Sequence, residues 1–183
     1  AKFETPIPYG KYYVQEISTD EHYVLNGEKY LVSFEYMGQD TDTVSVDCGK
    51  FVNVLKRGNV NGLKIDEETK SPLANAVFGL FKTTETEYSA DNAILTATSD
   101  ENGCFSFANI PYGDYVVKEV TAPVGYVILD KIYPVTVSED GDVVEITAEN
   151  KPGTGTVEIT KSDVSDGTLI PNCGLEILDK NKN

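Results

Sequence analysis

The stretch VVEITAEN at residues 143–150 alternates apolar and polar side chains, the period-two pattern of a strand with one buried face. The same alternation recurs in KYYVQEI (11–17), YVVKEV (115–120) and IYPVTV (132–137). Turn-forming residues separate such runs every ~8–12 positions, and no window keeps a helical spacing for long. Because a strand with one apolar face needs a second sheet to cover it, we predict an all-β chain built from β-sandwiches.

Charge and length exclude several partners. The chain has 183 residues and a formal net charge of −15. Nucleic acids and anionic membrane surfaces attract patches of Lys and Arg, so we expect neither as a partner. No run approaches the ~18 consecutive apolar residues of a membrane helix, so we expect no membrane insertion. The first residues lack the features of a signal peptide, which predicts a mature protein or an excised piece of one.

The residue types of common catalytic and metal sites are scarce. The one histidine, His22, lies in a polar stretch typical of a surface loop, which disfavours His-based nucleophilic catalysis. The three cysteines are Cys48, Cys104 and Cys173. They are too far apart in sequence to predict a zinc site, and their odd number argues against a disulfide framework. We expect each to be a small buried apolar residue. The acidic clusters at 139–142 and 163–166 lack calcium-loop spacing and are expected to be turns. We predict no metal and no cofactor.

The chain repeats itself out of phase. IPYGKY (7–12) matches IPYGDY 103 positions later, whereas Asn53 matches Asn150 at a spacing of 97. A unit of about a hundred residues is thus present once in full, at residues 59–152. Residues 1–58 match the C-terminal part of a preceding repeat, and residues 153–183 match the N-terminal part of a following one. We expect a fragment of a tandem array whose partners are neighbouring repeats, with head-to-tail self-association of the end pieces as a further possibility.

Polar residues occupy positions where the alternation calls for apolar ones. Asn150 falls in the apolar phase of strand 143–150, Glu119 in that of strand 115–120, and Lys64 in the register of Val60. Burying an unpaired charge is costly, and even a buried ion pair often stabilises no better than apolar residues. One interpretation is a structural Lys–Glu pair beside an Asn, or strand ends at which the polar groups reach water.

A second interpretation is chemical. Desolvation favours the neutral forms of both Lys and Glu. A neutral amine is a nucleophile, and a protonated Glu can hydrogen-bond the Asn carbonyl, polarise it and move protons. Held adjacent, the amine would attack the carboxamide with the advantage of intramolecular positioning. The product would be a Lys–Asn isopeptide bond, with ammonia released.

The unit 59–152 resembles the collagen-adhesin B-type domains, also called SpaA-like or prealbumin-like, of Gram-positive surface proteins and pilins. The segments that carry the resemblance are GLKIDEET (62–69), PLANAVF (72–78), GCFSF (103–107), IPYGDY (110–115), VKEVTAPVGY (117–126) and AENKP (148–152). Together they span the whole unit. The resemblance implies an immunoglobulin-like or prealbumin-like β-sandwich.

The resemblance also implies an autocatalytic isopeptide bond. Lys64 would be the nucleophile, Asn150 the electrophile and Glu119 the catalytic, proton-shuttling acid. By the same matching, the equivalents in the partial repeats are Glu16, Asn53 and Lys161. We expect each of these three residues to lack at least one of the two partners that complete a Lys–Glu–Asn site. We also expect that a bulge near Gly49 would be needed to turn the side chain of Asn53 inward.

In the resembled family the bond ties the first strand of a domain to the last, so the domain resists force, heat and proteolysis. We therefore predict a structural stalk or spacer repeat of a surface or pilus protein, extracellular and at the cell wall of a Gram-positive bacterium. It would not be an enzyme beyond a single self-cross-linking turnover. The alternative is a ligand-binding adhesin module whose loop 83–92 contacts a host surface protein or glycan. If that loop has no binding role, we expect it to be a hairpin loop exposed to solvent.

Overall fold

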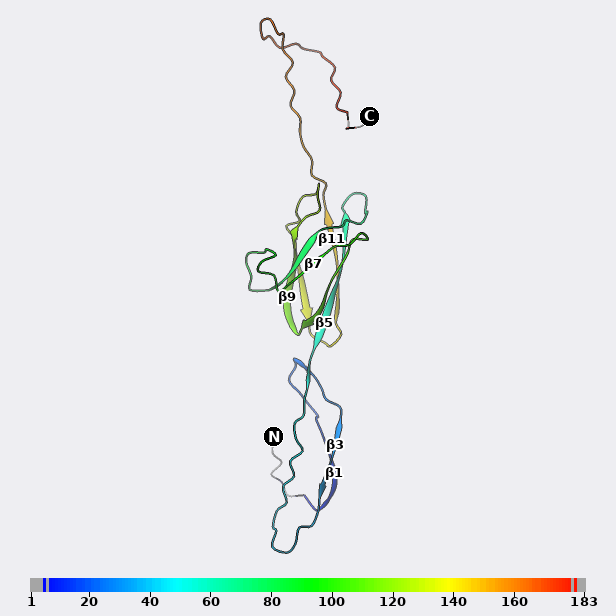
Figure 1. Ribbon diagram of the computed structural model, residues 1–183, viewed down its shortest axis with the longest axis vertical. Coiled ribbons are helices and arrows are strands. Elements are labelled where there is room, and N and C mark those ends of the chain that lie inside the picture. Colours follow the sequence, from blue (N-terminus) through cyan, green and yellow to red (C-terminus); the bar gives the residue numbers. More distant parts are fainter. Residues whose placement is uncertain (1–4, 6, 179, 181–183) are drawn as a thin grey trace. The chain divides into compact units, whose positions relative to one another are not determined.

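The computed structural model describes residues 5, 7–178 and 180 (Figure 1). Within these residues the chain forms strands and no helix, so the predicted all-β class is confirmed. It follows that the described part of the chain has no helix able to cross a bilayer. The chain divides into two compact units, residues 1–152 and 153–183.

A four-stranded antiparallel sheet forms one layer of the central sandwich. Its order is β10 (Ile132–Val137), β9 (Gly113–Thr121), β6 (Val77–Lys82) and β7 (Leu95–Thr98). Every second residue of β10 is buried, as the alternation predicts. The strand β7 is short and lies at an edge of this sheet.

A three-stranded sheet forms the facing layer. The central strand β5 (Arg57–Asp66) pairs antiparallel with β8 (Cys104–Pro111) and parallel with β11 (Val143–Asn150). The first and last strands of this sandwich are therefore neighbours, and they run in the same direction (Figure 1).

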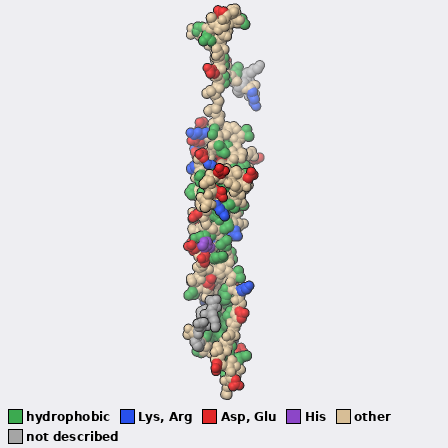
Figure 2. All heavy atoms as spheres, turned by 90° about the vertical axis from the view of Figure 1, so that its left-hand side faces the viewer, with side chains coloured by type: hydrophobic (Ala, Val, Ile, Leu, Met, Phe, Trp, Pro, Cys, Tyr) green, Lys and Arg blue, Asp and Glu red, His purple; other side chains and the backbone are tan. Residues whose placement is uncertain are grey.

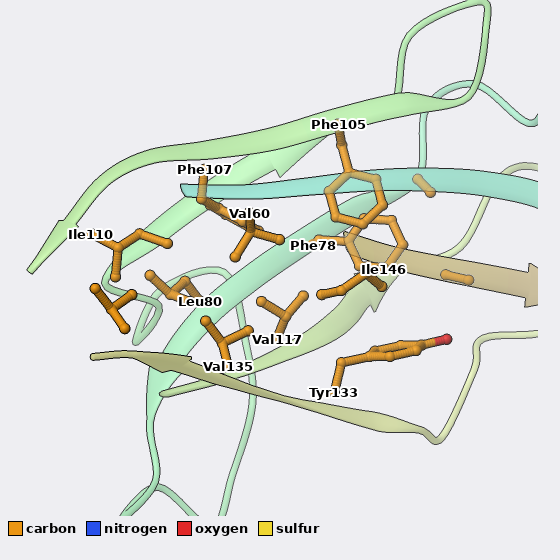
Figure 3. Packing of buried hydrophobic residues seen from close by; sticks show 13 residues of the cluster. Val60, Phe78, Leu80, Phe105, Phe107, Ile110, Val117, Tyr133, Val135 and Ile146 are labelled. Atoms are coloured by element: carbon orange, nitrogen blue, oxygen red, sulfur yellow. The ribbon is translucent and has the colours of Figure 1, made fainter. Parts of the chain in front are cut away.

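The core lies between these two sheets. Its buried apolar residues are Val60, Ala76, Phe78, Leu80, Phe105, Phe107, Ile110, Val117, Tyr133, Val135, Val137, Ile146 and Ala148. The rings of Phe78 and Phe105 stack at 3.9 Å between centroids with 8° between their planes (Figure 3). This stack joins the two layers, because Phe78 lies on β6 and Phe105 on β8.

The preceding residues form a smaller set of strands. Here β1 (Gly10–Gln15) pairs antiparallel with β3 (Lys29–Phe34), and β2 (Tyr23–Val24) pairs with β4 (Val54–Leu55). The pairing of β1 with β3 repeats the register of β9 with β10. Large apolar side chains stay exposed here, for example Tyr13 at 69%, Ile17 at 90% and Leu31 at 58%. Among the described residues, this part of the chain has the hairpin of the repeat and the short pair β2–β4, and no further sheet faces them.

Residues 153–178 contain one isolated bridge, between Ser162 and Leu169, and no longer strand among those described. Over the face shown in Figure 2, acidic side chains are interspersed with hydrophobic and basic ones. The negative charge is therefore spread over that face, without a single acidic patch.

The expectation that the cysteines are buried is wrong. Cys48 and Cys104 are exposed, and Cys173 is partly exposed. The strand β8 explains the case of Cys104, because its inward positions are taken by Phe105 and Phe107. The burial of Cys104 is therefore decided by the face of the strand on which it lies, and not by its apolar side chain.

The backbone of β5 is packed tightly against the core at Gly62. A Cβ atom added there would lie 2.0 Å from the ring of Phe105. That ring cannot easily withdraw, because its other contacts include the stack on Phe78. Glycine at this position therefore lets an aromatic ring cover the strand that carries Lys64.

We expect Gly62→Ala to lower the free energy of unfolding by about 1–3 kcal/mol, the usual cost of overpacking a core. Urea unfolding midpoints measure the loss. Gly27→Ala is the matched control, because a Cβ at Gly27 meets no atom within 4 Å. Equal losses in the two variants would contradict the packing argument.

Candidate cross-linking site

The structure brings together the three residues that we name the central triad: Lys64, Glu119 and Asn150. Their exposed fractions are 0%, 1% and 1%, respectively. The lysine and the asparagine come from the neighbouring strands β5 and β11, and the glutamate comes from β9 in the facing sheet. In the parallel register Lys64 lies opposite Ala148, which puts Asn150 two residues further along the same face.

One carboxyl group contacts both nitrogens of the triad. The Nζ of Lys64 donates to the side-chain Oδ1 of Asn150, and also to the backbone oxygen of Ala148 at 3.2 Å. The Nδ2 of Asn150 donates to the two carboxyl oxygens of Glu119 at 3.1 and 3.0 Å. The Nζ of Lys64 lies 3.8 Å from Oε1 of Glu119.

The orientation of the amide differs from the sequence-based expectation. We expected Glu119 to hydrogen-bond the carbonyl of Asn150, but its oxygens accept from the amide nitrogen. The reason is that the amide carbonyl accepts from the Lys64 amine, which turns the amide N–H groups toward the carboxyl. The nitrogen that would attack and the nitrogen that would leave therefore both face Glu119.

Burial sets the electrostatics of the site. It lowers the pKa of Lys64, and the nearby carboxylates of Glu119 and Glu149 partly oppose this effect. Burial, together with the negative charges of the same two residues, raises the pKa of Tyr133 to about 12. Tyr133 therefore stays neutral at physiological pH and contributes no charge, while the amine of Lys64 loses its proton more readily than an exposed lysine.

The sequence did not reveal two sets of contacts at and near the triad. The backbone N–H of Leu129 donates to Oε2 of Glu119 at 2.7 Å. The buried carboxylate of Asp66 accepts backbone N–H groups of Glu68 at 2.8 Å and Thr69 at 2.7 Å, and the hydroxyl of Tyr126 at 2.9 Å. The motif DEET at 66–69 has the composition of an Asx turn and offered a signal for the Asp66 contacts. The Leu129 contact is made by backbone and left no such signal.

Glu16 and Asn53 also meet, and we name them the first-repeat pair. The Nδ2 of Asn53 donates to both carboxyl oxygens of Glu16 at 2.9 Å and to Oγ1 of Thr19 at 2.7 Å. Gly49 has a φ of 75°, and no strand or bulge is assigned around it, so the bulge expected there stays a prediction. No lysine among the described residues hydrogen-bonds to Asn53, and Lys161 is exposed in the unit 153–183.

Comparison with known proteins identifies the class. A family model described as SpaA, a prealbumin-like fold domain, matches residues 58–152, just over half of the chain. The chain therefore belongs to this family, and the resemblance found in the sequence is confirmed.

Individual relatives agree with this class. The chain is 33% identical to a collagen adhesin of Staphylococcus aureus over 115 residues, which are 61% of this chain and 10% of the relative. It is 29% identical to the trypsin-resistant surface T6 protein of Streptococcus pyogenes serotype M6 over 99 residues, or 54% of this chain and 17% of that protein. The solved Bacillus anthracis TIE protein matches with a TM-score of 0.70 and 29% identity, over 88% of this chain and 28% of that one. The chain thus spans a small part of each relative.

We expect Asp66→Asn to destabilise the fold at neutral pH and to matter less in acid. Hydrogen bonds, first from the Thr69 backbone and then from the Tyr126 hydroxyl, hold the pKa of Asp66 below its usual value. Its carboxylate therefore stabilises the fold above the unfolded pKa of about 3.9, and this contribution is lost as the pH falls through the folded pKa.

Thermal unfolding midpoints of wild type and Asp66→Asn across this pH range test the expectation. The difference between them should shrink below about pH 4. The exposed Asp91 supplies the control variant Asp91→Asn, which should differ little from wild type at any pH. A difference for Asp66→Asn that stayed constant into acid would refute the role of the carboxylate charge.

Proposed function

We propose that residues 57–152 form a structural stalk or spacer module of a Gram-positive surface or pilus protein, braced by an isopeptide bond between Lys64 and Asn150. The observation that carries this proposal is the contact of a fully buried amine with a carboxamide, beside a carboxyl group that faces both nitrogens. A buried charge pair is a poor way to stabilise a core, so a chemical role accounts for these residues better than a structural one.

The geometry supports a complete reaction. The neutral Nζ of Lys64 attacks Cγ of Asn150, and a C–N bond forms. Glu119 accepts the proton that the attacking amine loses, since its Oε1 lies 3.8 Å from Nζ. The same carboxyl, 3.0–3.1 Å from Nδ2, delivers a proton to the departing nitrogen. Ammonia leaves, Glu119 is regenerated, and the chain has modified itself once without becoming a turnover enzyme.

The strand order gives this bond a mechanical role. Because β5 and β11 are parallel neighbours, force applied where the chain enters β5 and leaves β11 shears one strand against the other. A covalent link between the two strands would carry that force directly. The residues between Lys64 and Asn150, which are 86 positions apart, would then stay folded under load.

The relatives support a location on the cell surface. One is named a surface protein and the other an adhesin, both from Gram-positive bacteria. Together with the family match, these names support our proposal that this module lies outside the cell, attached to the cell wall through a longer chain in which its partners are neighbouring repeats.

The alternative function, an adhesin that binds a host protein or glycan through loop 83–92, has weaker support. The ring of Tyr88 packs edge-on against Phe81 at 5.0 Å, and the Nζ of Lys118 lies 5.3 Å from the centre of that ring. The aromatic residue of the loop is thus engaged with the sandwich. What favours binding is the name of one relative, of which this chain covers 10%.

We expect the intact mass of the folded chain to be lower than its sequence mass by one ammonia molecule. Lys64→Ala and Glu119→Gln should each abolish this loss while keeping the β-rich circular dichroism spectrum. Lys82→Ala, which removes an exposed lysine of β6, should retain it. A wild-type chain with its full sequence mass would reject the bond and leave the fold unaffected.

We also expect the bond to reduce the length by which the chain extends when it is pulled from both ends. In single-molecule pulling from residues that flank 57–152, wild type should extend less than Lys64→Ala by roughly 300 Å, at about 3.5 Å for each of the 86 positions between the linked residues. Equal extensions for wild type and variant would argue against a mechanical brace.

A further inference from the structure

The loop between β9 and β10, residues 122–131, is tied to both strands that the proposed bond would link. The hydroxyl of Tyr126 donates to Oδ2 of Asp66, the last residue of β5, at 2.9 Å. The backbone N–H of Val127 donates to the carbonyl of Lys151, the residue after β11, at 3.0 Å. The loop therefore joins the ends of β5 and β11 at the end of the sandwich that holds the central triad.

The same loop reaches the carboxyl group of the triad. The backbone N–H of Leu129 donates to Oε2 of Glu119 at 2.7 Å, and the side chain of Leu129 packs against the core. The other oxygen, Oε1, is the one that lies 3.8 Å from Nζ of Lys64. The Leu129 N–H thus occupies one carboxyl oxygen and leaves the other directed to the amine.

This backbone contact recurs in the first repeat. The N–H of Asn26 donates to Oε2 of Glu16 at 2.8 Å, ten positions after the glutamate, just as Leu129 comes ten positions after Glu119. The two loops differ in sequence, with TDEH at 19–22 against APVG at 122–125. Fixing one oxygen of the glutamate is therefore a property of the path of the loop backbone, and the path must be held by other contacts.

The two loops are held by different contacts. In the first repeat the two residues of β2 pair with the two residues of β4. In the central sandwich the matching contact is a single bridge between Tyr126 and Pro152. Proline has no backbone N–H, so this bridge cannot gain a donor from Pro152. The hydroxyl bond of Tyr126 supplies a further attachment, whereas no hydrogen bond of the described residues involves the hydroxyl of Tyr23, the matching residue of β2.

We name the hydrogen bond between Tyr126 and Asp66 the clasp, and its acceptor is held firmly. Asp66 is 4% exposed, and its Oδ1 already accepts the backbone N–H groups of Glu68 and Thr69. The bond to Asp66 raises the pKa of Tyr126, so the hydroxyl keeps its proton and remains a donor. Asp66 lies two residues beyond Lys64 on the same face of β5. The clasp is therefore anchored to the strand that carries the amine.

We propose that Tyr126 is a positioning residue for the isopeptide reaction. Through the clasp it holds the loop 122–131 in place, so that the Leu129 N–H fixes Oε2 of Glu119. Oε1 then stays directed to the amine of Lys64. The inference rests on the reaction proposed for the central triad. Because the loop is tied to β5 and to the end of β11, the carboxyl group is fixed only in chains whose first and last strands are already paired.

The rate of ammonia loss tests this role. Tyr126→Phe removes the hydroxyl and keeps the ring, and Tyr23→Phe is the matched control. The full chain is made in a short cell-free translation pulse and sampled over time. Half of each sample is treated with protease to score folded chain, and half is quenched in acid for intact mass, which separates slow folding from slow chemistry. After folding, Tyr126→Phe should lose ammonia about tenfold more slowly than wild type, since a misplacement of ~1 Å can cost ~100-fold.

A second control separates positioning from stability. Val137 is buried in the core and pairs with Gly113, at the end of β9 away from Glu119. Val137→Ala should lower the urea midpoint and still lose ammonia at the wild-type rate once folded, as should Tyr23→Phe. Slowing by Val137→Ala equal to that by Tyr126→Phe would show that stability alone sets the rate, and it would overturn the inference.

The amide proton of Leu129 reports the positioning directly. In the Lys64→Ala background, which has no amine to react, Tyr126→Phe should shift the Leu129 N–H resonance and speed its exchange with solvent, while the amides of β6 stay unchanged. An unchanged Leu129 amide, or equal rates of ammonia loss in wild type and Tyr126→Phe, would overturn this inference and leave the proposed function standing. A folded wild type that loses no ammonia would overturn both.

Discussion

The central site depends on holding the amine of Lys64 out of water. Burying an ammonium group costs several kcal/mol unless it is paired or neutralised. Here the amine contacts an amide oxygen and lies near a carboxyl group that is itself buried. The proposed reaction would remove this cost for good. The buried amine and the carboxamide would become a neutral amide and free ammonia, so the titratable amine would no longer be in the core.

The position of the triad follows from the topology. A parallel pair needs a long crossover, and in this chain the strands between β5 and β11 form the crossover and also cover the pair. Glu119 comes from the covering sheet, where it lies opposite Phe78 on β6. The carboxyl therefore reaches the site only when the two sheets pack face to face. The triad is assembled by the whole sandwich, and no single hairpin contains it.

Period-two alternation allowed the inward positions of Lys64, Glu119 and Asn150 to be predicted, because strand phase is a local property that the side chains reveal. The orientation of the Asn150 amide could not be predicted in this way, since it depends on which partner each atom meets across the core. The backbone N–H of Leu129 was missed because any residue type supplies it. Cys104 was misjudged because its residue type suggests burial while its strand phase points outward.

The structure contains two pairs of a glutamate and an asparagine, the first-repeat pair and Glu119 with Asn150. Comparing them shows that the hydrogen-bond geometry of such a pair does not depend on how deeply the pair is buried. The first-repeat pair has nearly the same hydrogen bonds as Glu119 and Asn150, although no second sheet covers it within the part of the chain that the structure describes. The hairpin β1–β3 and the segment just before β4 are therefore enough to set the acid–amide geometry. Its members stay half-buried, however, whereas those of the central triad are 1% exposed. Because a lysine in water keeps its proton, only a completed sandwich would release the nucleophile, which would make bond formation a consequence of correct folding.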